Sequence, residues 1–224
     1  MKLTAVSPLL VTLGLAACGG DDGGVNPLID AARADAAIDA PVVCSISSAA
    51  FGDRGALVPS SCIQDPGQMA NDPSDDVIVL RAPLQAGSPF DELEIQLWAG
   101  YGALANGFAN GTYPIAGDEL QFATCGVCVF INSKRSDPMT YVDDYFATGG
   151  SVTLTSVAGN LTGTVTGLTF EHVTVAQGMT SPVGDGCVTA VAGGTFTAPI
   201  TAPPAKRGQL VSRRAKGRVA HNSL

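Results

Sequence analysis

Alternation of apolar and polar residues is the main secondary-structure signal in this chain. Residues 92–98 read Glu-Leu-Glu-Ile-Gln-Leu-Trp, so the leucines and isoleucine share one face and the polar residues share the other. A period of two over this length is typical of a β-strand. The pattern therefore predicts a strand with one face in the core and the opposite face in water.

A second alternating stretch predicts a hairpin. Residues 151–157 alternate valine and leucine with threonine, and Gly159 and Asn160 follow, a pair suited to the positive φ angles of a tight turn. The return strand begins at Leu161. Its apolar phase shifts after Gly167 and again near His172, which predicts a bulge at the glycine and a bend near the histidine.

Further strands are predicted over 76–81, 126–132, 140–147 and 187–200, which makes seven or more in total. No stretch of ten or more residues keeps an apolar period of 3.6, and glycine, proline, asparagine and aspartate punctuate the strands. We therefore expect an all-β domain over 42–201, built as an antiparallel sandwich or in a jelly-roll-like arrangement.

The first residues are typical of an export signal. A basic start is followed by an apolar run over 3–15, which is too short to span a bilayer but fits a signal peptide. Residues 15–19, Leu-Ala-Ala-Cys-Gly, resemble the lipobox of bacterial lipoproteins. The resemblance implies cleavage of a signal peptide over 1–17 and a lipid anchor on Cys18. The alternative is an ordinary secretory signal with a chance cysteine. In enteric bacteria, an aspartate directly after the lipidated cysteine tends to retain a lipoprotein at the inner membrane. Gly19 occupies that position here, so we expect the protein at the outer membrane of the cell envelope.

Two segments flank the predicted domain. Residues 18–41 are rich in aspartate, alanine and glycine, which predicts a flexible tether. Residues 202–224 carry six of the 12 basic residues and no acidic one, which predicts a disordered tail. This tail is either simply solvated or in contact with an anionic lipid or glycolipid surface. The stretch from Asp21 to Asp185 contains all 20 acidic residues and five basic ones, so its net charge is −15. This charge argues against nucleic acid as a partner.

Five cysteines follow Cys18, an odd number for an oxidising compartment. Their spacing favours a disulfide between Cys44 and Cys62, and another between Cys187 and either Cys125 or Cys128, although sequence leaves every arrangement open. A Cys-x-x-Cys motif at the start of a redox helix would have a reactive thiol. Here the motif precedes a predicted strand, so we expect a structural disulfide.

Other candidate sites are each explained more simply by structure. His172 has no recognisable serine nucleophile, and no second ligand pair for zinc is apparent, since neither it nor His221 has ligand spacing. Acidic residues in loops lack the Asp-x-Asp-x-Asp-Gly pattern of a calcium site. They are Asp72, Asp75, Asp76, Asp143 and Asp144.

A carbohydrate site is a further candidate, because carboxylates and aromatic rings occur together in Asp91, Glu92, Glu94, Trp98 and Tyr101. The alternation places both glutamates on the outward face of the strand. We therefore interpret them as solvated surface residues and assign no catalytic residue, metal or cofactor.

The lipobox, the tether, the Cys-x-x-Cys motif and the segment 145–154 together resemble uncharacterised lipoproteins of myxobacterial type. This resemblance implies no activity. We expect a non-catalytic binding or envelope-structural module, anchored to the membrane through Cys18, with an envelope glycan or protein as ligand. The alternative hypothesis is a secreted hydrolase that acts on envelope or external polymers.

Overall fold

A computed structural model describes residues 42–65, 76–137 and 140–202. The predicted signal peptide, the tether, Cys18 and nearly all of the basic tail lie outside these ranges. Within them, no helix is both long and apolar enough to cross a membrane.

Strands dominate the described residues, with two short 3₁₀ helices in the connection between the fourth and sixth strands. The strands are β1 (Asp53–Ala56), β2 (Ser61–Asp65), β3 (Val77–Pro83), β4 (Phe90–Trp98), β5 (Gly111–Pro114), β6 (Val127–Arg135), β7 (Asp144–Ala158), β8 (Asn160–Ala176), β9 (Met179–Pro182) and β10 (Val188–Pro199). The 3₁₀ helices are η2 (Gly102–Leu104) and η3 (Gly117–Leu120).

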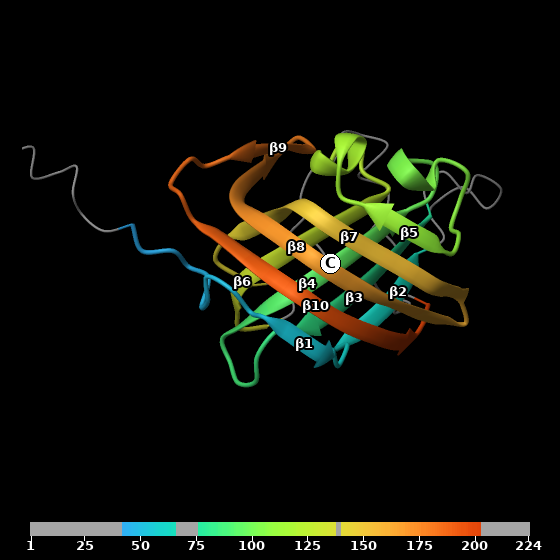
Figure 1. Ribbon diagram of the computed structural model, residues 1–224, viewed down its shortest axis with the longest axis horizontal. Coiled ribbons are helices and arrows are strands. Elements are labelled where there is room, and N and C mark those ends of the chain that lie inside the picture. Colours follow the sequence, from blue (N-terminus) through green and yellow to red (C-terminus); the bar gives the residue numbers. More distant parts are fainter. Residues whose placement is uncertain (1–41, 66–75, 138–139, 203–224) are drawn as a thin grey trace, which may run out of the picture. The chain divides into compact units, whose positions relative to one another are not determined.

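All ten strands belong to one curled sheet. Its order is β1-β10-β8-β7-β6-β4-β3-β2, with β5 added to β7 and β9 added to β8. Figure 1 shows β7, β8 and β10 in front of β2, β3 and β4. The curl brings the end of β10 back to β2, where Gln64 N donates to Thr201 O and Thr201 N donates to Cys62 O at 2.9 and 3.0 Å. The all-β prediction is confirmed, whereas the sandwich is not, because one sheet carries every strand.

The predicted hairpin is the longest feature of the sheet. β7 and β8 run 15 and 17 residues, and they join at Gly159, whose φ is +72°. Of the two turn residues, Gly159 takes a positive φ and Asn160 does not, so the expectation for Asn160 is wrong. Gly167 has a φ of +58° and is skipped in the pairing of β8 with both neighbours, which confirms the bulge.

The second phase shift in β8 has a different cause. Pairing with β7 continues without a break through His172, so no bend interrupts the ladder there. Leu168 and Phe170 belong to the inner core, but Val173 belongs to a second apolar cluster. The apolar residues change phase because the strand passes from one core to the other.

The inner core fills the curled sheet with branched and aromatic side chains from every long strand. Leu80, Leu93, Ile95, Ile131 and Phe196 are among its fully or almost fully buried members. At about 1.5–3 kcal/mol for each such side chain, this burial is the main source of stability.

A second cluster covers the opposite face of β3, β4 and β6. Phe122, which follows η3, packs edge-on against Phe130 with 5.3 Å between ring centroids, and Phe130 in turn contacts Phe146 at 4.6 Å. Both faces of β4 are therefore buried. The prediction that one face of this strand meets water is wrong, because alternation reports the polarity of a face and not what covers it.

Gly163 tests how closely the hairpin packs. A Cβ atom there would lie 2.2 Å from Thr153 O and 2.7 Å from the Phe196 ring, so Gly163→Ala must displace a strand or a core ring. We expect a loss of about 1–3 kcal/mol in the free energy of unfolding, measured by denaturant titration.

The matched control is Gly193→Ala, whose new Cβ would meet its nearest atom, Asp53 Oδ1, at 3.4 Å. We expect this variant to unfold near the wild-type midpoint. Equal midpoints for both alanine variants would contradict the packing described for β8.

Candidate functional site

The cysteines pair differently from the sequence-based expectation. Cys44 is bonded to Cys187 across a sequence separation of 143 residues, with the two Cα atoms 5.5 Å apart. Cys62 is buried in the inner core and unpaired. The predicted bond between Cys44 and Cys62 is wrong because strand order, and not closeness in sequence, brings the start of β10 to the first segment of the domain.

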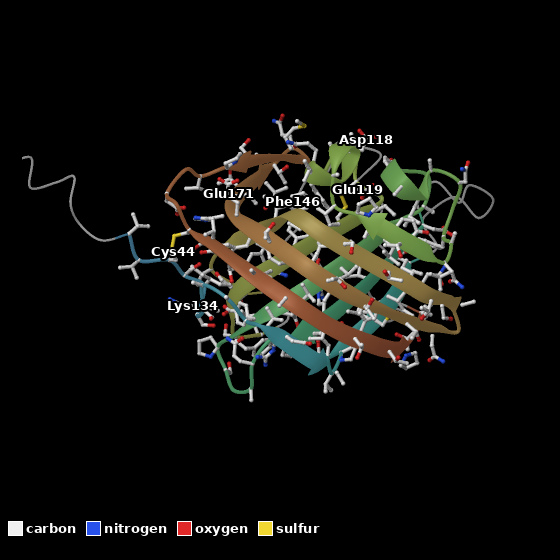
Figure 2. The ribbon with its side chains drawn as sticks, viewed as in Figure 1. Cys44, Asp118, Glu119, Lys134, Phe146 and Glu171 are labelled. Atoms are coloured by element: carbon white, nitrogen blue, oxygen red, sulfur yellow. A yellow bond between two sulfur atoms is a disulfide. The ribbon has the colours of Figure 1, made fainter. Side chains whose placement is uncertain are left out.

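The Cys-x-x-Cys motif forms a local disulfide between Cys125 and Cys128, so neither is the partner of Cys187. Both residues are fully buried before and within β6. The carboxylate of Glu119, a residue of η3 that Figure 2 labels, accepts hydrogen bonds from the backbone nitrogens of Gly126 and Val127 between the two cysteines. A buried disulfide held this way serves as a structural cross-link, as the sequence predicts, because partners for thiol exchange need access.

Burial also makes the remaining thiol inert. The pKa of Cys62 is raised to about 11 by burial, so the reactive thiolate is scarce at neutral pH. Its neighbours in the core are apolar, and it lies 4% exposed.

The thiol arrangement predicts a specific labelling pattern. Apart from any label on Cys18, native protein treated with iodoacetamide at pH 8 should remain unlabelled, and unreduced protein unfolded in guanidinium should take one label in the domain, on Cys62. Peptide mapping without reduction should recover Cys44 linked to Cys187. A peptide that links Cys44 to Cys62, or rapid native labelling of Cys62, would contradict the structure.

The carboxylates that suggested a carbohydrate site form a buried ionic network on the second face of β3, β4 and β6. Arg81 Nε donates to Glu94 Oε2 at 2.7 Å, and Arg135 Nε lies 3.0 Å from Glu92 Oε2. Ser60 Oγ donates to Glu92 Oε1 at 3.1 Å, and Gln96 Nε2 donates to Glu94 Oε1 at 2.5 Å.

Burial and charge act in opposite directions on Glu92. Burial raises its pKa and outweighs Arg135 and Arg81, which lower it. Tyr141 lies beside this network, and burial followed by the charge of Asp144 raises the pKa of its hydroxyl. Both glutamates are at most 2% exposed, so this pair is not the solvated surface that the sequence suggests. Inside the protein, the charges of Glu92 and Glu94 are neutralised by those of Arg135 and Arg81.

The other members of the carbohydrate candidate are also engaged in the fold. Trp98 Nε1 donates to Gln96 Oε1 at 3.0 Å, and Tyr101 packs on the second apolar cluster. Asp91 is fully buried and accepts from the backbone nitrogens of Ser47 at 3.0 Å and Lys134 at 2.9 Å. These five residues are thus engaged in contacts between strands and loops of the described fold.

Removal of one charge from this network should be costly. Arg135→Met keeps the length of the side chain but leaves Glu92 with Arg81 at 4.0 Å as its nearest described cation. We expect a loss of about 3–5 kcal/mol in the free energy of unfolding, because an uncompensated carboxylate stays buried. Addition of Glu92→Gln should restore part of that loss.

Arg54→Met is the matched control, since Arg54 is exposed on β1, and a change within about 0.5 kcal/mol is expected. Chemical denaturation of the wild type, Arg135→Met, Arg135→Met with Glu92→Gln, and Arg54→Met measures the loss in the free energy of unfolding and its partial recovery. An Arg135→Met variant as stable as Arg54→Met would contradict a buried network.

His172 links three segments at the disulfide end of the domain. Its Nδ1 lies 2.6 Å from Asp185 Oδ2, its Nε2 lies 3.4 Å from Asp143 Oδ1, and its ring stacks on Tyr145. The backbone nitrogen of Cys187, followed by His172, lowers the pKa of Asp185. No serine or threonine hydroxyl is hydrogen-bonded to His172 among the described contacts, so the histidine serves to join the segments.

Of the five acidic residues considered for calcium, the three that the structure describes form no metal-binding group. Asp143 contacts His172, and Asp144 accepts from the hydroxyl of Tyr141 at 3.3 Å. Asp76 follows the gap at 66–75, and Asp72 and Asp75 lie outside the described residues. Among the residues that the structure covers, no group of three or more histidine, cysteine or acidic side chains is placed to hold a metal ion.

A shallow hollow of about 320 Å³ lies at the seam where β10 meets β2. The residues that line it carry no charge, and most are small: Pro59, Ser60, Ser61, Cys62, Ile63, Ala198, Pro199, Thr201 and Ala202. No carboxylate lines it. The hollow therefore lacks the paired acids that hydrolysis of a glycosidic bond uses.

Comparison of this chain with protein-family models, with curated proteins and with solved structures gives no match. The class of protein is therefore defined by the fold and its sites alone. The described residues form a small all-β domain with two disulfides, one buried thiol and a buried ionic network.

Proposed function

We propose that this protein is an exported lipoprotein, anchored to the bacterial envelope through Cys18, whose β domain serves as a non-catalytic binding or structural module. The observation that carries the proposal is the sequence Leu-Ala-Ala-Cys-Gly over 15–19, placed directly after an apolar run of signal-peptide length. Because Gly19 follows the cysteine, we propose the outer membrane as its destination.

The disulfides support export. Cys44–Cys187 and Cys125–Cys128 account for four of the five cysteines that follow the lipobox. Such bonds form and persist in oxidising compartments, whereas the cytosol keeps thiols reduced. The chain that precedes Val42 then acts as a spacer between the lipid and the domain.

The engagement of the acidic groups supports a non-catalytic role. Glu92 and Glu94 are paired with arginines, and Asp91 and Glu119 accept hydrogen bonds from backbone nitrogens. A general acid or nucleophile must reach its substrate, and buried carboxylates committed to the fold do not. The domain is therefore proposed to act through its surface.

The anchor is tested by Cys18→Ser in cells that make the full chain. Serine cannot form the thioether, so we expect the protein to leave the membrane fraction. Stable attachment needs two or more acyl chains, and loss of the thioether removes the diacylglyceryl group. Immunoblots of membrane and soluble fractions measure the distribution.

Cys62→Ala is the matched control, because it removes a cysteine of the domain and leaves the lipobox intact. It should remain with the membrane. Equal membrane retention of Cys18→Ser and the wild type would sink the proposed anchor.

A further inference from the structure

The front of the curled sheet carries threonine hydroxyls in register. Thr112 of β5 pairs with Thr153 of β7, Thr153 pairs with Thr164 of β8, and Thr164 pairs with Thr195 of β10. Four threonines from four neighbouring strands thus form one row on the outward face. At strand spacing the row is about 14 Å long. Figure 1 shows these four strands side by side at the front.

Hydroxyls continue on both sides of this row. Ser151 pairs with Thr166 in the next row, and Thr162 pairs with Thr197 in the row on the other side. Adjacent rows lie about 7 Å apart, the length of two strand residues. We call these four threonines and their flanking rows the threonine face.

Each of these hydroxyls keeps donor or acceptor capacity for a ligand. Thr112 and Thr153 share one hydrogen bond of 3.0 Å between their Oγ1 atoms, and Thr195 Oγ1 donates to Gly55 O at 3.4 Å. Among the described contacts, the hydroxyls of Thr164, Thr166 and Thr197 have no hydrogen-bond partner in the protein. A hydroxyl both donates and accepts, and β-branching restricts χ1, so the groups are presented with little rotational freedom.

The strands that supply the threonine face carry no charged residue along this stretch, and Asp53 of β1 borders the flanking row at Gly193. Residues 102–117, 145–170 and 188–202, which supply its strands, contain no Asp, Glu, Lys, Arg or His, although residues 21–185 carry a net charge of −15. A cationic ligand would prefer the acidic remainder of the domain, and an anionic polymer would be repelled by it. Charge therefore favours a neutral partner that itself presents many hydroxyls.

The curvature of the sheet distinguishes between two such partners, a crystal plane such as ice and a single polymer strand. A rigid crystal plane such as ice needs a wide level array, but this sheet curls until its ends meet. A single polymer strand can follow one curved row. We propose that the threonine face binds a neutral polysaccharide chain laid across β5, β7, β8 and β10.

This inference rests on the proposed export, which brings the domain to envelope or external glycans. Each hydroxyl contributes only a small part of the binding free energy, so affinity depends on several contacts made at once. Loss of three of the four row hydroxyls should therefore weaken binding at least about tenfold.

The test uses the full chain as cells produce it, extracted in detergent and sedimented with insoluble cellulose, chitin and α-glucan, and with polygalacturonate as an anionic comparison. The variant combines Thr153→Val, Thr164→Val and Thr195→Val, which remove hydroxyls while keeping shape and strand propensity. Thr174→Val is the matched control, since Thr174 is exposed on the same strand β8 but beyond the row. Unfolding midpoints of all variants establish that they fold.

Retention of wild type and Thr174→Val on a neutral polysaccharide, with loss in the triple variant, is the expected result. Retention on none of the three neutral polymers, preference for polygalacturonate, or equal retention of the triple variant overturns the proposal. Inhibition of ice recrystallisation by the wild type alone, without polysaccharide retention, also overturns it in favour of ice. Membrane fractionation of the same cells before detergent extraction reports the proposed anchor separately, so failure of one proposal can be told from failure of the other.

Discussion

The covalent bond between Cys44 and Cys187 is the constraint on which the two ends of the domain depend. The segment before β1 belongs to no strand, and it is fixed by contacts that the cross-link brings within reach. Ser45 Oγ lies 2.7 Å from Ser133 Oγ, and Thr189 Oγ1 donates to Ser48 O at 2.7 Å. A loop of this length, once closed, costs the unfolded chain about 4 kcal/mol or more in entropy, so the bond stabilises the fold chiefly through the unfolded state.

The closed sheet divides its outward surface into two chemically different halves. Behind, β3, β4 and β6 bury arginines and glutamates that neutralise one another, together with an aromatic cluster around Phe130. In front, β5, β7, β8 and β10 present threonine hydroxyls without charge. The side chains of the first half are committed to contacts within the fold, and the second half is the surface for which we propose a ligand.

The all-β class could be predicted because alternation survives in single strands, and Gly167 could be recognised from the shift of apolar phase beside it. The burial of Glu92 could not, because the chain segments that cover it are distant in sequence. The prediction of cysteine pairing was wrong for the same reason, since strand order decides which thiols meet. The threonine face left a signal in the threonines of 153–166, but only the register between strands aligns Thr112 with Thr195.

The proposed export joins these features, since it would supply both the oxidising compartment for Cys44–Cys187 and the polymers for which we propose the front face as a binding surface. Intact mass spectrometry of unreduced protein from native membranes tests this most directly. The account predicts a chain that begins at Cys18, carries the mass of a diacylglyceryl group and an amide-linked acyl chain, and lacks two hydrogens for each of its two disulfides. A chain that retains Met1, or one whose Cys18 carries no lipid, would contradict it.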